Sequence, residues 1–248
     1  MKISFNQSRV SVRMSILFSI FLMFTLSAQN NEWGIAIGAT GYHGDIEVKN
    51  NSLLQQARPI AGVFYRYHLS ERWAFRGQLL FGQLYIDEKR YAIASPDNFR
   101  EKRGISFTTT LLELSILPEW RFAHVGDVDF YAFSGIAGFY FNPIVNYNEP
   151  NPVIGDKNLD KGAVYSKFSW AIPFGGGMQW FVNDKIAIGL EGTLRKTFTD
   201  QIDGLSLSGN PKIKDYYFFA NLTLSTFFGS QQRSGLGRKN KNIGCPTF

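Results

Sequence analysis

The stretch at residues 112–122, LELSILPEWRF, carries apolar side chains at nearly every second position. One face is apolar and consists of Leu112, Leu114, Ile116, Trp120 and Phe122. The other face is polar and includes Glu113, Ser115, Glu119 and Arg121. A period of two predicts a β-strand, because successive side chains of a strand point to opposite faces. This strand therefore separates an apolar environment from one that accepts charge.

The same alternation recurs along the chain. With its flanks, the quoted stretch forms a segment at 105–122, and seven others follow the pattern at 32–40, 59–69, 72–86, 128–141, 168–182, 185–196 and 215–228. The segment at 128–141 is apolar on both faces and fits the pattern least well. A tilted strand crosses a bilayer in about 9–11 residues. The lengths predict eight membrane-spanning strands.

The connections between these segments alternate in length. Short turns are expected at 69–72, 123–127 and 183–184, whereas long polar loops are expected at 40–58, 87–104, 142–167 and 197–214. Short turns at one end and long loops at the other are typical of outer-membrane barrels. A soluble β-sandwich is the alternative, but it has no need to sort its loops by length. We predict an all-β, eight-stranded antiparallel transmembrane barrel of the outer-membrane type.

The N-terminus has the features of an export signal. Three basic residues and no acid precede the apolar run at 14–26, and Ser27 and Ala28 follow it. This order is typical of a secretory signal peptide, and the apolar run is shorter than a spanning helix needs, which disfavours an uncleaved anchor. We expect a signal peptide at 1–28, a barrel at 29–228 and a basic periplasmic tail at 229–248, with both termini periplasmic and the barrel in a Gram-negative outer membrane.

Composition supports this class. Aromatic residues make up 16% of the chain, charged residues only 19%, and there are 24 glycines and one cysteine. An exported chain of this kind, without disulfides to stabilise it, is a β-sandwich or a barrel. The net charge of +6 does not indicate nucleic-acid binding, because the expected compartment holds no such target.

The lumen of so small a barrel is expected to be filled by side chains. The predicted inward faces bring acids and bases together, so their charges can pair. This lumen network comprises Glu113, Glu119 and Glu191 with Arg66, Arg76, Arg121 and Arg195. We interpret it as structural; the alternative is a catalytic or ion-relay cluster.

Enzyme chemistry finds little support. Some small outer-membrane barrels modify lipids with a histidine and a serine near the outer leaflet, but His68 and His124 are predicted at periplasmic strand ends. His43 falls in the first long loop without an evident serine partner. The glycines at 175–177 lie within a strand, where they permit curvature instead of binding phosphate. We assign no catalytic, cofactor-binding or metal-binding residue.

Several motifs, in their order and spacing, resemble the PorG-type outer-membrane barrels of the type IX secretion system. They are Gly41-Tyr42-His43-Gly44-Asp45, Pro173-Phe174-Gly175-Gly176-Gly177, Glu191 with Arg195 and Thr197-Phe198-Thr199-Asp200, and Asp215-Tyr216-Tyr217-Phe218-Phe219. The resemblance covers nearly the whole mature chain. The fourth long loop departs from the family pattern at Gln201, where an aromatic residue is usual, and at Gly204, where an acid is usual.

The resemblance implies a non-enzymatic barrel that anchors or scaffolds a periplasmic ring containing a lipoprotein. Arg233, Arg238, Lys239 and Lys241 make the tail basic, and it contains no acid, so it suits docking on an acidic surface. The lone Cys245 would lie in an oxidising compartment, which favours an intermolecular disulfide; by resemblance its partner is the ring lipoprotein. The alternatives for the tail are contact with outer-membrane lipid, and for the thiol, capping by a small molecule or simple exposure. A lipid-modifying barrel and a free-standing OmpA-like structural barrel are the alternative functions.

Overall fold

The computed structural model describes residues 31–43, 56–87, 106–146, 165–199, 201–202 and 216–228. These residues form nine antiparallel strands in one sheet. The strands are β1 (Asn31–His43), β2 (Arg58–His68), β3 (Trp73–Asp87), β4 (Ser106–Val125), β5 (Val128–Ser134), β6 (Ile136–Asn146), β7 (Phe168–Phe181), β8 (Ile186–Thr197) and β9 (Tyr216–Phe228). The predicted signal peptide and tail lie outside the described residues. The described part of the chain contains no helix that is long and apolar enough to span a lipid bilayer.

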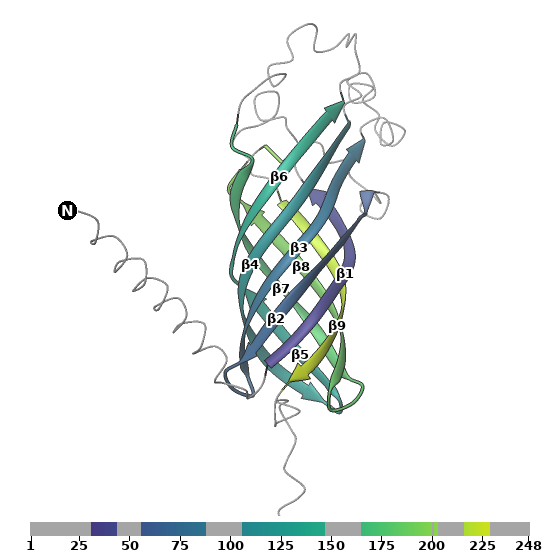
Figure 1. Cartoon of the computed structure of the whole chain (residues 1–248), viewed down its shortest axis with the longest axis vertical. Helices are drawn as coiled ribbons and strands as arrows, with labels where there is room; N and C mark the ends of the chain where they lie inside the picture. Colours follow the sequence, from purple (N-terminus) through teal and green to yellow (C-terminus); the bar gives the residue numbers. More distant parts are fainter. Residues whose placement is uncertain are drawn as a thin grey trace, which may run out of the picture.

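The sheet closes into a barrel because its first and last strands pair. Asn31 of β1 faces Phe228 of β9, and the pairing continues to His43 opposite Tyr216. Each remaining strand pairs with its neighbours in the ring, so the sheet has no open side (Figure 1). The prediction of an outer-membrane-type antiparallel barrel is therefore confirmed.

The predicted strand at 128–141 appears as two elements, β5 and β6, with a break at Gly135. Both keep the same register with their neighbours: Phe133 and Ile136 face Glu119 and Ile116 on β4. Two prolines flank the break, Pro118 on β4 and Pro173 on β7, and neither has an N–H to donate. The nine elements thus occupy eight strand positions in the barrel, as predicted, because β5 and β6 share one position. The backbone hydrogen-bond ladder is interrupted where the prolines of the neighbouring strands have no N–H to donate.

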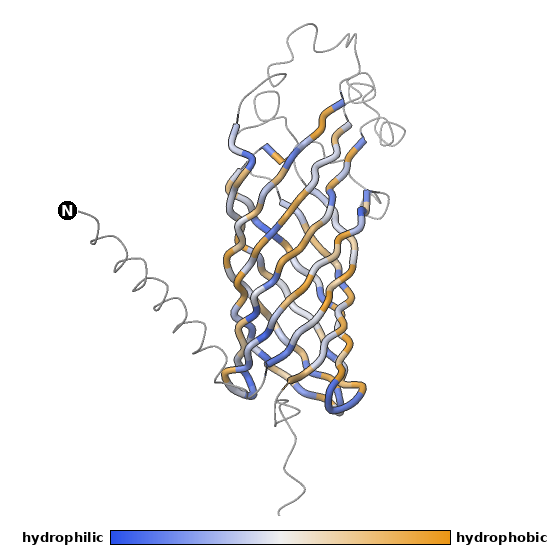
Figure 2. Tube along the Cα trace, in the orientation of Figure 1, coloured by the Kyte–Doolittle hydropathy of each residue, from blue (hydrophilic) through white to orange (hydrophobic). Residues whose placement is uncertain are grey.

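Hydropathy alternates along the strands (Figure 2). Because successive side chains point to opposite faces, this alternation separates a lipid-facing wall from the lumen. On β3 every second residue from Ala74 to Ile86 is buried, whereas the residues between them are mostly exposed. Thirty-two large apolar side chains are exposed on the described residues, with Ile116 at 64% and Leu114 at 63%. Such a continuous apolar exterior requires an apolar solvent, and a bilayer supplies it.

Packed aromatic and aliphatic side chains fill the part of the lumen nearest the long loops. Tyr42, Phe107, Phe139 and Tyr217 belong to one buried cluster there. Ile202, from the last long connection, joins this cluster, and its carbonyl accepts a hydrogen bond of 2.6 Å from the Thr109 hydroxyl. This end of the barrel is a core and not an open channel.

Three short turns join strands at the other end of the barrel, where β1 begins and β9 ends (Figure 1). The turn between β4 and β5 contains Gly126 with a φ of 62°. Glycine adopts this left-handed conformation without the steric cost that other residues incur. The barrel therefore has a short-turn end, where β1 begins and β9 ends, and a loop end.

Candidate functional site

The inward faces bury acidic and basic side chains on six of the nine strands. Ten such side chains are at most 3% exposed: Glu32, Arg66, His68, Arg76, Glu113, Glu119, Arg121, Asp129, Glu191 and Arg195. Among them are five carboxylates and four guanidinium groups. An isolated buried charge costs several kcal/mol, so these groups are stable only if they pair. We call them the lumen network.

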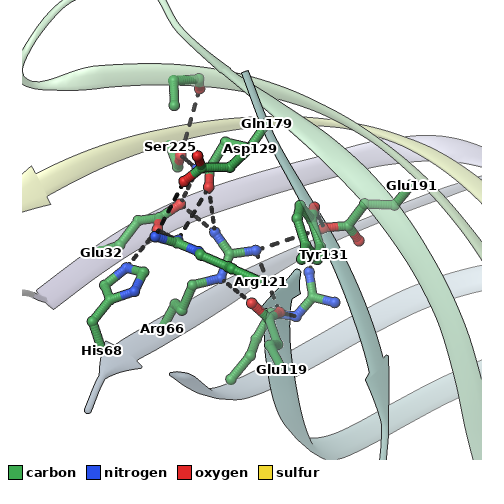
Figure 3. Close-up of polar contacts among 12 residues, drawn as sticks. Glu32, Arg66, His68, Glu119, Arg121, Asp129, Tyr131, Gln179, Glu191 and Ser225 are labelled. Carbon is green, nitrogen blue, oxygen red and sulfur yellow. Dashed lines mark hydrogen bonds and ion pairs between the residues drawn. The ribbon is translucent and has the colours of Figure 1, made fainter. Parts of the chain in front are cut away.

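Arg66 on β2 is the centre of the lumen network (Figure 3). Its Nη1 lies 2.5 Å from Glu32 Oε1, its Nε 2.6 Å from Glu119 Oε2, and its Nη2 3.7 Å from Glu191 Oε1. These three carboxylates come from β1, β4 and β8. The planar guanidinium can serve several acceptors at once, which suits it to this position. Arg66 thus connects strands on opposite sides of the barrel.

Arg76 on β3 shares two of these carboxylates. Its Nε lies 2.8 Å from Glu119 Oε1 and its Nη1 2.5 Å from Glu191 Oε1. Glu191 also accepts a hydrogen bond of 2.5 Å from the Tyr131 hydroxyl on β5. The rings of Phe64 and Phe133 lie beside the Arg76 guanidinium, at 5.6 and 4.6 Å. Cationic and anionic groups alternate here, so each charge has an opposite neighbour.

Two histidines, His68 and His124, lie toward the short-turn end and contact carboxylates of the lumen network. His68 Nε2 lies 3.0 Å from Glu32 Oε2, and Gln179 donates to Glu32 Oε1 at 2.7 Å. His124 Nδ1 lies 2.5 Å from Asp129 Oδ1. Both histidines therefore contact carboxylates. This arrangement does not resemble a serine activated by histidine.

Arg121 links these two groups at the short-turn end. Its Nη1 lies 3.6 Å from Asp129 Oδ2 and its Nη2 3.9 Å from Glu32 Oε2. It also donates to Gln179 Oε1 at 3.3 Å. Gln179 thereby bridges Arg121 and Glu32, because its amide oxygen accepts from Arg121 and its amide nitrogen donates to Glu32.

A separate pair lies nearer the loop end, within the aromatic core. Arg195 Nε lies 2.8 Å from Glu113 Oε2, which also accepts a hydrogen bond of 2.8 Å from the Tyr217 hydroxyl. The Arg195 guanidinium is 3.7 Å from the centre of the Phe219 ring. A cation on an aromatic face gains further stabilisation in a dry environment. This pair joins β4, β8 and β9 across the lumen.

The structure brings together the residues that the sequence pattern assigns to the lumen, but in two groups. Arg76, Glu119, Arg121 and Glu191 belong to the larger group around Arg66, whereas Glu113 and Arg195 form the separate pair. The sequence analysis missed Glu32, His68 and Asp129 as members of the lumen network, and Tyr131, Gln179 and Tyr217 as its uncharged hydrogen-bond partners. Their positions share the inward parity of their strands, which was the available signal. The predicted partner-binding residues Arg233, Arg238, Lys239, Lys241 and Cys245 lie outside the described residues.

The ion pairs and hydrogen bonds of the lumen network hold the strands of the barrel together. Several of these ion pairs connect strands that are not neighbours in the sheet, such as Arg66 with Glu119 and Glu191, and these pairs brace the barrel across its interior. Within the described ranges, no group of three or more potential ligand side chains is arranged to hold a metal ion. The favourable role for such a network is structural, since paired and hydrogen-bonded charge is the form in which charge can be buried.

Comparison with known proteins gives one family and a set of distant structures. A family model described as "Domain of unknown function (DUF6089)" matches residues 11–233. No curated protein matches the chain. Ail of Yersinia pestis, solved with a heparin analogue, is 10% identical with a TM-score of 0.44, covering 80% of this chain and 98% of that one.

Two further barrels are similar in shape. Neisserial surface protein A (NspA) is 8% identical with a TM-score of 0.47, covering 79% of this chain and 96% of that one. The N-terminal β-barrel domain of Pseudomonas aeruginosa OprF is 13% identical with a TM-score of 0.38, covering 79% and 97%. At these identities the likeness concerns the fold alone.

Proposed function

This chain belongs to the DUF6089 family, and we propose that it is a non-enzymatic outer-membrane barrel that anchors or scaffolds a periplasmic ring of the type IX protein secretion machinery. The observation that carries the proposal is the filled lumen. Most of the paired charges occupy the short-turn side, and packed aromatic residues fill the loop side around the Glu113–Arg195 pair. A barrel filled in this way acts through its outer surfaces and its ends, which is what a scaffold requires.

The wall supports a place in the outer membrane. Its exposed side chains form an apolar band, and four of the five tryptophans, Trp33, Trp73, Trp120 and Trp180, lie on it toward the short-turn end. Tryptophan favours the boundary between lipid and water, where its apolar ring and its N–H are both accommodated. We place this boundary at the inner leaflet, with the short turns in the periplasm.

The position of the strand ends supports the scaffold role. Asn31 and Phe228 face each other at the short-turn end, so the segments before β1 and after β9 both begin there. The segment after β9 contains four basic residues and no acid. In the proposed orientation it enters the periplasm beside the ring, where an acidic partner surface would attract it. Its Cys245 is then available to form a disulfide with the ring lipoprotein.

Affinity purification from mildly solubilised membranes tests the proposal. We expect the intact barrel to copurify with a periplasmic lipoprotein, and non-reducing gels to show a high-mass band that reductant removes. Cys245→Ser should abolish that band. Neutralising the tail with Arg238→Gln, Lys239→Gln and Lys241→Gln should reduce copurification. Recovery of the barrel alone from cells with an active secretion system would contradict the proposal.

A free-standing OmpA-like structural barrel is the second candidate, because a braced lumen serves it equally well. In that case no ring component would copurify, and deletion would impair envelope integrity without blocking secretion. A lipid-modifying enzyme is the third candidate from the sequence. The carboxylate contacts of His68 and His124 give it no support.

A further inference from the structure

A groove runs across the lipid-facing wall in the half of the barrel nearest the loops. It spans β9, β1, β2 and β3, with Leu190 of β8 at one edge, and has a volume of about 750 Å³. Small side chains form its floor: Ala39, Pro59, Ala61 and Ala220. Ile37, Phe81 and Leu222 rise around it and are 56%, 57% and 55% exposed. We call this feature the wall groove.

The strand register explains the depth of the wall groove. Ala220, Ala39 and Pro59 are direct cross-strand neighbours, so three small residues lie in one row. The adjacent row contains Leu222 opposite Ile37. Directly opposed residues in a sheet lie about 5 Å apart, so a row of small side chains beside a row of large ones forms a continuous trough.

The row of small residues continues beyond the groove, toward the short-turn end of the barrel. Outward-facing small residues follow one another from β5 to β9, each paired with the next: Ala132, Gly176, Gly192 and Ala220. The row thus climbs across the wall and reaches the loop end at β2. The wall groove occupies the part of this row that lies nearest the loops.

Arg58 lies beside the loop-side end of the groove: the lining residues Pro59 and Gln83 are next to Arg58 and two positions before Tyr85. Arg58 directly precedes Pro59, and its guanidinium carbon lies 4.0 Å from the centre of the Tyr85 ring. The Thr40 hydroxyl donates a hydrogen bond of 3.2 Å to the Arg58 carbonyl, which holds the backbone at this point. A guanidinium that packs on an aromatic face directs its N–H groups outward in its own plane, where they can bind a phosphate.

We propose that the wall groove binds an acyl chain of a lipid with an anionic phosphate headgroup, and that Arg58 binds this headgroup. The groove lies in the apolar band, where lipid chains are the surrounding solvent. Its polar mouth is at the loop end, where headgroups of the adjacent leaflet lie. Apolar walls below one cation match the chemistry of such a lipid: the groove accepts the chain and Arg58 accepts the charge.

Native mass spectrometry of the purified full barrel tests this site. The probes are dipalmitoyl phosphatidylglycerol, which is anionic, and dipalmitoyl phosphatidylcholine, which has the same chains and no net charge. We expect the wild type to favour the anionic lipid about fivefold, which corresponds to ~1 kcal/mol for one arginine near a headgroup. Arg58→Gln should bind both lipids equally.

A variant that fills the groove tests binding of the acyl chain separately from binding of the headgroup charge. Ala61→Leu should weaken both lipids severalfold, whereas the matched change Ala132→Leu, on the outer wall beyond the groove, should leave binding unchanged. Each variant is first shown to be folded by its shifted mobility in unboiled gel samples. Inorganic phosphate should not compete.

Three results would overturn the proposal: equal binding of the two lipids by the wild type, unchanged binding by Ala61→Leu, or full competition by inorganic phosphate. A dimer that Ala61→Leu abolishes would assign the groove to a second copy of the chain instead.

Discussion

Removing the charge of Glu113 gives a direct test of the lumen pairing. Glu113 and Arg195 are fully buried and contact each other at 2.8 Å, apart from the larger group around Arg66. Glu113→Gln keeps the side-chain volume and one acceptor oxygen but removes the charge. Arg195 would then be a buried cation without its counter-charge.

The expected loss follows from the contacts that remain. Breaking a buried ion pair by removing one partner costs about 3–5 kcal/mol. The new amide can still accept from Arg195 and Tyr217, and the Phe219 ring still covers the cation. We therefore expect the lower end, about 3 kcal/mol. Arg195→Met should cost a similar ~3 kcal/mol, because it strands the carboxylate.

The double variant separates pairing from other effects. With both charges gone no uncompensated charge remains, so we expect a loss of ~1–2 kcal/mol, well below the summed ~6 kcal/mol of the single changes. Urea unfolding in detergent micelles, followed by tryptophan fluorescence, measures these free energies. Glu71→Gln, in an exposed turn, serves as the control and should stay within about 0.5 kcal/mol of the wild type.

Two outcomes would refute this reasoning. Single variants that both lie within ~1 kcal/mol of the wild type would show that the two charges are not buried as a pair. A double variant that loses the full sum would show that each side chain acts independently.

Three further predictions follow from the same structure. Arg66→Met should lower the unfolding free energy by about 3–5 kcal/mol, measured by the same urea titration, because Arg66 serves three carboxylates. Gly126→Ala should cost about 1–2 kcal/mol and Gly126→Asn less, since a φ of 62° suits asparagine better than alanine; equal effects would contradict this. The mature protein should begin near Gln29, as N-terminal sequencing of the outer-membrane fraction can show, and should give a β-type circular dichroism spectrum and heat-dependent gel mobility; an intact Met1 would exclude cleavage.

Local pattern determined the architecture of this protein. Alternation needs only neighbouring residues, so a stretch such as 112–122 identifies a strand and both of its faces without knowledge of its partners. Turn lengths are equally local, and they distinguish the two ends of the barrel. Arg76, Glu119 and Glu191 could be assigned to the lumen for the same reason, because parity along a strand specifies the side on which a residue lies.

Only the tertiary structure decided which of these residues meet. Contacts across the lumen depend on the register of every strand that lies between the two residues, and a shift of one position reverses the faces of a strand. Arg66 and Glu191 are 125 positions apart in the sequence, and their contact requires the closed ring. The membership of Glu32 and Asp129, the break at Gly135 between two prolines, and the row of small residues beneath the wall groove all arise from this register. Sequence parity places a side chain inside or outside the barrel, and register determines its height and its partners.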